Sequence, residues 1–168
     1  MKTIKKTIYV TFLCLSVILA SCSSSDDDGG TDDGTGGTGD EFLTAKVDGS
    51  NFEAAQSPAV IVGATSGNGL MTFQGGTNEG NTIRGSVFNY NGAGTYTTGD
   101  NIANVNSLMY ITLPNNAWSS TFDIGSGTIT ITSDDGTTIE GTFSFEGYNS
   151  EDQTTKTITE GNFKAIIE

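Results

Sequence analysis

Residues 126–149 read SGTITITSDDGTTIEGTFSFEGYN, and this stretch decides the fold class of the 168-residue chain. On both sides of Asp135-Gly136, apolar residues alternate with threonine, serine and glutamate. Alternation with a period of two is typical of a strand with one buried face, and an Asp-Gly pair between two such strands favours a tight hairpin. We therefore expect strands over 127–132 and 138–148. The side chains expected to face inward are Ile129, Ile131, Ile139, Phe143 and Phe145. Those expected to face outward on the second strand are Glu140, Thr142, Ser144, Glu146 and Tyr148.

The last segment, residues 155–168, continues the pattern with one interruption. Phe163, Ala165 and Ile167 fall on one face, whereas Ile158 has the opposite parity. One extra residue in a strand restores such a register, so we expect a β-bulge at Gly161.

Shorter alternating or apolar segments fill the region upstream, and no stretch shows helical spacing. Turn pairs at Asp48-Gly49, Asn68-Gly69 and Asn91-Gly92 separate several of them, and residues 114–116 are expected to form a loop. About nine or ten short strands with frequent turns predict an all-β fold, a single antiparallel β-sandwich that is mostly up-and-down, with a lipocalin-like β-barrel as the alternative. The upstream segments are 43–47, 51–55, 59–64, 70–75, 82–90, 94–99 and 107–113.

The chain before this region has the order of an export signal. Residues 1–21 carry three lysines within the first six positions and continue into an uncharged apolar run that is short for a membrane-spanning helix. This order predicts a signal peptide. The run ends Leu19-Ala20-Ser21-Cys22, which resembles a bacterial lipobox. We expect Cys22 to carry acyl chains after cleavage, and two or three chains anchor a protein stably in a membrane.

Residues 22–41 are expected to form a disordered acidic tether, because serine, aspartate, glycine and threonine cannot build a core. Behind the cysteine, Ser23, Ser24, Ser25, Asp26, Asp27 and Asp28 resemble the surface-export signal of Bacteroidota lipoproteins. The localisation expected is the outer membrane, facing the cell exterior, with the periplasmic leaflet as the alternative. Residues 42–168 are expected to be the β domain.

Composition excludes several function classes for this domain. It holds thirteen acidic and four basic residues, a net charge of −9, which argues against nucleic-acid binding. The chain has no histidine, and its two cysteines, Cys14 and Cys22, both precede the domain. Histidine-dependent catalytic triads and nearly all zinc and copper sites are thereby excluded, and no cofactor is expected.

Four stretches resemble a domain-of-unknown-function family of small Bacteroidota lipoproteins, mostly flavobacterial. They are FLTAKVDGSNFEAA (42–55), GTYTTGD (94–100), residues 126–149 and KTITEGNFKAII (156–167). The resemblance covers essentially residues 42–168 and implies a lipid-anchored β domain, without an activity to transfer. Residues 115–122, NNAWSSTF, match least well.

Few residues suggest a site. Trp118 and Tyr148 are the best candidates for exposed aromatic side chains that stack on sugar rings, although core packing is the ordinary role of aromatics in a β domain. Asp134 and Asp135 form a weak calcium candidate, since calcium needs six to eight oxygen ligands, and a plain turn is the simpler interpretation. Glu140 and Glu146 lie roughly 20 Å apart along one strand, too far for a catalytic pair.

These observations favour a non-enzymatic binding or accessory module for a glycan or an envelope protein partner. A structural or adhesion role is the alternative, and a hydrolase comes third.

The lipobox gives a direct prediction. Cys22→Ser removes the thiol that accepts the lipid, so the protein should leave the membrane fraction and appear in the soluble fraction on immunoblots. Thr35→Ser, a conservative change in the tether that leaves the lipobox intact, serves as the control. Membrane pelleting of an unprocessed Cys22→Ser chain would show that the lipobox interpretation is wrong.

Overall fold

The computed structural model describes residues 41–55 and 63–168. The predictions for the signal peptide, Cys22, the export signal and the tether lie outside the described residues, as does most of the predicted 59–64 strand. Within the described ranges, no helix is long and apolar enough to cross a membrane.

The described residues form an all-β fold of eleven strands without a helix. Their bounds are β1 Phe42–Val47, β2 Ser50–Glu53, β3 Gly63–Gly67, β4 Leu70–Gly76, β5 Thr82–Phe88, β6 Gly94–Thr98, β7 Ser107–Thr112, β8 Asn116–Thr121, β9 Ser126–Asp134, β10 Thr138–Asn149 and β11 Thr154–Ile166. The antiparallel all-β fold expected from the alternating pattern is confirmed, with slightly more strands than expected, and its single curled sheet is consistent with a β-sandwich or a half-barrel.

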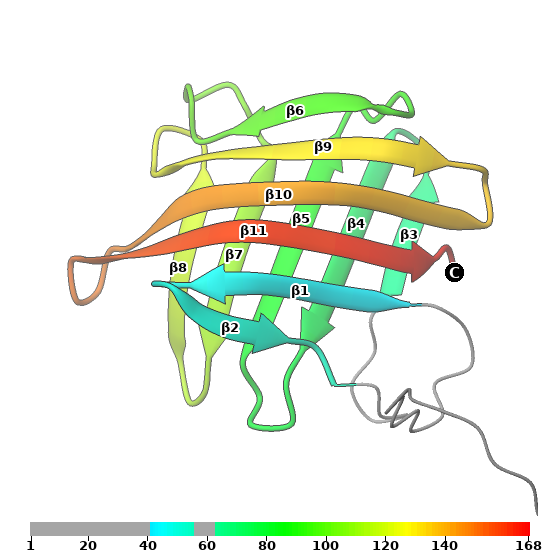
Figure 1. Cartoon of the computed structure of the whole chain (residues 1–168). Helices are drawn as coiled ribbons and strands as arrows, with labels where there is room; N and C mark the ends of the chain where they lie inside the picture. The colour runs from blue at the N-terminus through cyan, green and yellow to red at the C-terminus, as the bar shows by residue number, and fades with distance from the viewer. Residues whose placement is uncertain (1–40, 56–62) are drawn as a thin grey trace, which may run out of the picture. The chain divides into compact units, whose positions relative to one another are not determined.

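The strands belong to one antiparallel sheet that curls into two layers. One layer holds β2, β1, β11, β10, β9 and β6, and the other holds β8, β7, β5, β4 and β3. Figure 1 shows the first layer in front, with its strands running across those of the second layer. Such crossing is typical of orthogonal packing, in which strands pass from one layer to the other at the corners.

Strand β10 makes the corner between the layers. It pairs with β11 along its whole length and with β9 as far as Glu146, and Tyr148 near its end pairs with Ser119 of β8. Gly147 allows this close approach, because a Cβ there would lie 2.8 Å from the main-chain carbon of Trp118. On the opposite side, Ala64 of β3 pairs with Ile167.

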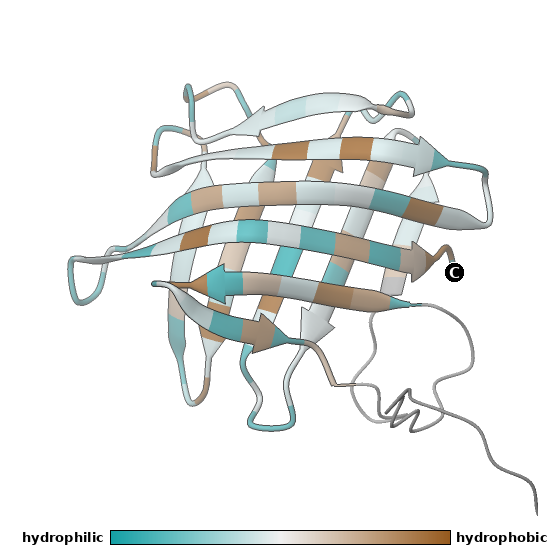
Figure 2. Cartoon of the chain, in the orientation of Figure 1, coloured by the Kyte–Doolittle hydropathy of each residue, from teal (hydrophilic) through white to brown (hydrophobic). Residues whose placement is uncertain are grey.

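The core lies between the two layers. The five side chains predicted to face inward on β9 and β10 are all buried, and Figure 2 shows hydrophobic residues alternating with polar ones along these strands. Three phenylalanine rings, Phe73, Phe143 and Phe163, pack together across the layers. The Phe73 and Phe163 rings stack with centroids 4.0 Å apart, and the Phe73 and Phe143 centroids are 5.4 Å apart.

The predicted bulge near Gly161 is confirmed. Phe143 of β10 pairs with Gly161, but Phe145 pairs with Ile158, so β11 contains one residue more than its partner over this step. Glu160 takes the positive φ of 52° at the bulge. The extra residue turns Ile158 inward with Phe163, and both are buried.

Two local predictions are wrong. Residues 115–122 contain a strand, β8, that begins at Asn116 within the expected loop. Its inward positions hold Trp118 and the polar Ser120, whose hydroxyl bonds to Thr98 at 2.6 Å, so the stretch lacks the usual apolar alternation. Asn91-Gly92 does not close a hairpin either, because β5 pairs with β4 and β7, whereas β6 pairs with β9.

The packing around Phe73 gives a stability prediction. Gly85 pairs with Phe73 across β4 and β5, and a Cβ at Gly85 would overlap the Phe73 ring. Gly85→Ala should therefore lower the free energy of unfolding by about 1–3 kcal/mol, the usual effect of overpacking. Gly67→Ala is the matched control, since a Cβ there meets nothing within 4 Å, and its effect should stay within about 0.5 kcal/mol. Urea unfolding checks both; equal effects would contradict this account of the core.

Candidate functional site

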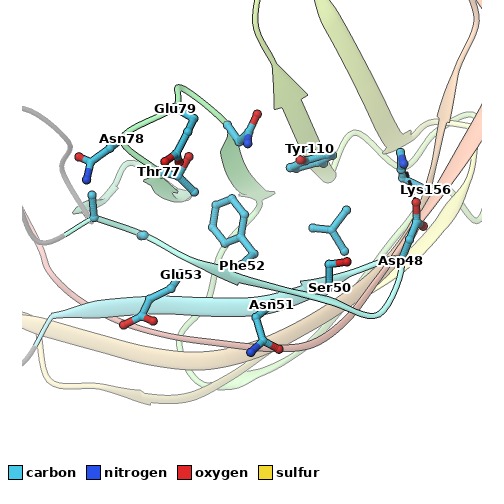
Figure 3. A pocket seen from close by; sticks show the side chains of 14 residues that line it. Asp48, Ser50, Asn51, Phe52, Glu53, Thr77, Asn78, Glu79, Tyr110 and Lys156 are labelled. Carbon is cyan, nitrogen blue, oxygen red and sulfur yellow. Dashed lines mark hydrogen bonds and ion pairs between the residues drawn. The ribbon is translucent and has the colours of Figure 1, made fainter.

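An open groove of about 720 Å³ lies between the β1–β2 hairpin and the turn that joins β4 to β5. Figure 3 shows Phe52 on one wall and Thr77, Asn78 and Glu79 on the other, with Tyr110 and Lys156 toward one end. The lining residues are Val47, Asp48, Ser50, Asn51, Phe52, Glu53, Ala54, Ala55, Thr77, Asn78, Glu79, Asn81, Tyr110 and Lys156. They come from four separate parts of the chain, which are residues 47–55, residues 77–81, Tyr110 and Lys156.

Main-chain pairing brings the two walls together at one point. The Ala55 amide donates to the carbonyl oxygen of Gly76 at 2.8 Å, which ties the chain after β2 to the end of β4. The turn opposite is closed by hydrogen bonds between Thr77 and Asn81 and between Gly80 and Thr77.

Aromatic side chains support the groove from below. The Phe52 and Tyr110 rings meet edge to face with centroids 6.3 Å apart, and Tyr110 stacks on Trp118 at 5.7 Å. Phe52 and Tyr110 are only 5 % and 8 % exposed. Burial raises the pKa of the Tyr110 hydroxyl, so it stays protonated at neutral pH. These rings give the groove a firm base but little aromatic surface.

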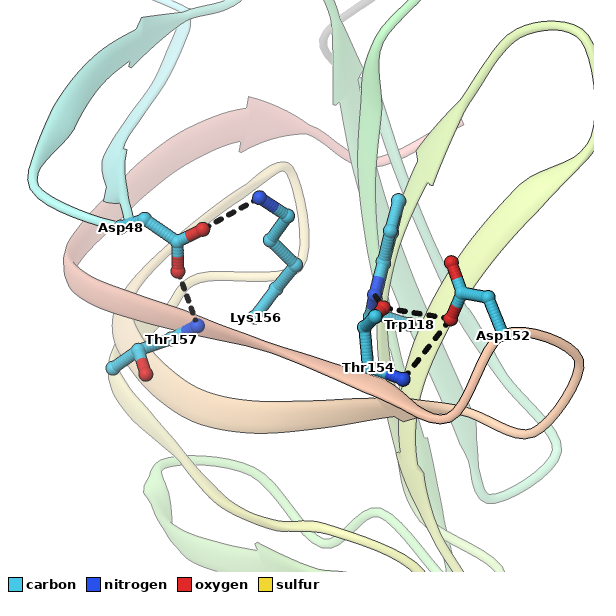
Figure 4. Close-up of polar contacts among 6 residues, drawn as sticks. All are labelled: Asp48, Trp118, Asp152, Thr154, Lys156 and Thr157. Atoms are coloured by element: carbon cyan, nitrogen blue, oxygen red, sulfur yellow. Dashed lines mark hydrogen bonds and ion pairs between the residues drawn. The ribbon is translucent and has the colours of Figure 1, made fainter.

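An ion pair stands at the hairpin end. Lys156 Nζ lies 2.6 Å from Asp48 Oδ2, and Asp48 Oδ1 accepts a hydrogen bond from the Thr157 amide at 2.9 Å. Figure 4 shows both contacts. The hydrogen bond from Lys156, followed by that from Thr157, lowers the pKa of the Asp48 carboxyl. The hydrogen bond to Asp48 raises the pKa of Lys156, so both groups are held in their charged forms.

The prediction that Trp118 is exposed is wrong. Its side chain is 7 % exposed, and its indole Nε1 donates to Thr154 Oγ1 at 2.8 Å. Thr154 Oγ1 in turn donates to Asp152 Oδ1 at 2.7 Å, as Figure 4 shows. Lys156 Nζ lies 5.6 Å from the centre of the Trp118 ring. The indole is thus a buried support beneath the groove.

Tyr148 does not join Trp118 in a shared platform. Tyr148 pairs in register with Ser119, the residue next to Trp118, so the two aromatic side chains occupy opposite faces of the sheet. Tyr148 is half-buried and lines a separate hollow of about 270 Å³ with Ser119 and Ile124.

Asp134 and Asp135 serve the β9–β10 turn. Asp135 Oδ1 accepts hydrogen bonds from the amides of Thr138 and Thr137 at 2.7 and 2.8 Å, which lower the pKa of its carboxyl. Asp134 accepts from the Gly136 amide and, at 2.6 Å, from the Tyr90 hydroxyl. Across the described ranges, no group of three or more acidic, histidine or cysteine residues is placed to hold a metal ion.

Sequence reasoning did not identify the groove. Asp48 was interpreted only as a turn residue, and Lys156 lies 108 positions away. The one available signal was the Asp48-Gly49 hairpin, which places a carboxylate at a turn. The lysine that pairs with this carboxylate is brought to it only by the pairing of β1 with β11.

A comparison with family models covers nearly the whole domain. The model described as domain of unknown function DUF6252 matches residues 40–167. The chain belongs to this family. All eleven described strands of the DUF6252 domain lie within the match. Neither the curated proteins nor the solved structures gave a match to the chain.

The ion pair of this DUF6252 domain predicts a pH-dependent contribution to stability. Asp48→Asn removes the charge but keeps a residue that suits the positive φ of 48° in the turn. Because the Asp48 pKa is lowered in the folded state, wild type should exceed the variant in stability by up to about 1 kcal/mol near pH 7, less at high salt. The difference should vanish as the pH falls below about 4.

Urea unfolding at several pH values measures this difference. A double-mutant cycle with Lys156→Met isolates the pair, because Asp48→Asn should then lose only the smaller contribution of the hydrogen bond from the Thr157 amide. A difference that persists unchanged at pH 2 would show that the ion pair is not its source.

Proposed function

We propose that this protein is a lipoprotein, anchored through Cys22 in the outer membrane and facing the cell exterior, whose β domain binds a polypeptide partner. The observation that carries the proposal is the open groove of about 720 Å³ beside the β1–β2 hairpin. Specific sites are concave surfaces with a few positioned polar groups, and this groove combines a rigid aromatic base with polar walls.

The titratable groups at the groove support binding rather than catalysis. A general acid or base works best with a pKa near the working pH. Here the hydrogen bond between Asp48 and Lys156 lowers the pKa of the carboxyl and raises the pKa of the ammonium. The carboxyl therefore keeps its charge to lower pH and the ammonium to higher pH. Such a pair fixes geometry and recognises charge, and it is poorly suited to move protons.

A polypeptide suits the groove better than a sugar chain does. Sugar recognition by stacking needs exposed aromatic faces, and Trp118, Tyr110 and Phe52 are all buried. A glycan is the second candidate, favoured by the amide side chains of Asn51, Asn78 and Asn81 along the walls. Amides pair readily with hydroxyl groups.

The proposed lipid anchor and surface location rest on the sequence before the β domain. The lipobox at residues 19–22 supplies the lipid site, and the serine and aspartate run behind it supplies the export signal. The acidic domain, at net charge −9, is repelled by anionic surfaces and attracts basic partners from the surroundings.

Photo-crosslinking on intact cells tests the proposal. A benzophenone amino acid at Asn78, exposed on the groove wall, should give an adduct with a polypeptide. The same amino acid at Thr142, exposed on the outer face of β10, is the matched control and should give none. Equal adducts from both positions, or none from Asn78, would contradict polypeptide binding at the groove. In the latter case, glycan-array binding that is lost in Asn78→Ala would support the glycan instead.

A further inference from the structure

Strand β2 is an edge strand, because its only strand partner among the described residues is β1. In an antiparallel pair, residues alternate between those that bond to the opposite strand and those whose main-chain groups point away. The Ala54 amide donates to the Leu43 carbonyl oxygen at 2.9 Å, so Ala54 and Phe52 bond toward β1. Asn51 and Glu53 therefore direct their amide and carbonyl groups away from β1.

Ala55, two residues after Glu53, also directs its amide away from β1, and this amide has a partner. Ala55 donates its amide hydrogen to the carbonyl oxygen of Gly76 at 2.8 Å. The main-chain groups of Asn51 and Glu53 continue the same row toward the hairpin, and within the described residues no hydrogen bond reaches them. This row borders the groove, which both residues line.

Two other edges in the described part of the sheet are each contacted at one residue. At β6, the Thr97 carbonyl oxygen accepts hydrogen bonds from Asn104 Nδ2 at 2.8 Å and Asn106 Nδ2 at 3.0 Å. At β3, Glu168 donates its amide to the Ala64 carbonyl oxygen at 3.0 Å. Proteins commonly protect exposed edges, since bare main-chain groups recruit other strands.

We propose that the groove binds its polypeptide partner as an extended strand that pairs with Asn51 and Glu53 on the free edge of β2. The inference rests on the proposed function, because it names the form of the partner at the same site. Strand addition of this kind takes affinity from main-chain hydrogen bonds and specificity from alternating side chains.

The residues that line the groove indicate which side chains the partner strand should carry. Phe52 and Ala54 face the core side of β2, whereas Asn51 and Glu53 are exposed on its other face. A strand beside β2 therefore places one set of side chains near Phe52, where apolar groups fit, and the other set near Glu53. Lysine or arginine suits the second position, because Glu53 and the acidic domain attract positive charge. The partner is an extended segment in which apolar and basic residues alternate.

The test uses the full chain in nonionic detergent and the peptide acetyl-Lys-Val-Lys-Val-Lys-Val-amide. Isothermal titration calorimetry should detect binding. The same peptide with every amide nitrogen methylated keeps its side chains and charge but loses the donors that β2 needs, so its affinity should fall at least tenfold. A peptide with glutamate in place of lysine should also bind at least tenfold more weakly.

Two protein variants make a matched pair. Asn51→Pro removes an amide that points away from β1, a position where an edge strand tolerates proline, and should weaken binding at least tenfold. Asn51→Ala changes the side chain and keeps the amide, so its affinity should stay within twofold of wild type. Circular dichroism checks that both variants fold, and if Asn51→Pro does not, the methylated peptide decides the question with the wild-type chain.

Absence of binding by the parent peptide, or equal affinity for the parent and methylated peptides, would overturn strand pairing. Equal affinities of Asn51→Pro and Asn51→Ala would overturn it as well. If strand pairing fails in these tests but Asn78 still gives a crosslink, the groove holds a polypeptide in another form. Loss of that crosslink instead removes the proposed function itself.

Discussion

Three phenylalanine rings, each lying over a glycine of the neighbouring strand, hold the two layers of the sheet together. Phe73 pairs with Gly85, Phe143 with Gly161, and Phe163 with Gly141. A Cβ on Gly141 would approach the Phe163 ring to 2.9 Å, so the absence of side chains on these glycines makes room for the rings. Because Phe73 comes from one layer and the other two from the opposite layer, their contact sets how closely the layers pack.

The position of the groove follows from how the layers are joined. Strand β10 joins them at the β8 corner, and Ala55 joins them through Gly76. Strand β2 is only four residues long and adds no further pairing. Between these connections the layers leave an open groove, with Tyr110 and Trp118 beneath it and the Asp48–Lys156 ion pair at the hairpin end. Because the core is held together elsewhere, the outer edge of β2 can remain without a strand partner.

Local signals made much of the fold predictable. The β9–β10 hairpin and the bulge near Gly161 followed from alternation and parity, which depend only on nearby residues. Strand β8 was missed because Ser120 takes an inward position, made acceptable by its hydrogen bond to Thr98. The burial of Trp118 depends on Thr154, and the ion pair depends on residues joined only by strand pairing. Such long-range contacts leave no local pattern, so the groove emerged only from the folded chain.

Residue-resolved amide hydrogen exchange on the unliganded protein measures directly whether β2 presents a free edge at the groove. A free edge should give rapid exchange at Asn51 and Glu53 beside slow exchange at Phe52 and Ala54, whose amides bond to β1. Ala55, bonded to Gly76, should also exchange slowly. Slow exchange at Asn51 and Glu53, equal to that of Phe52, would show that this edge is already paired and is not available to a partner strand.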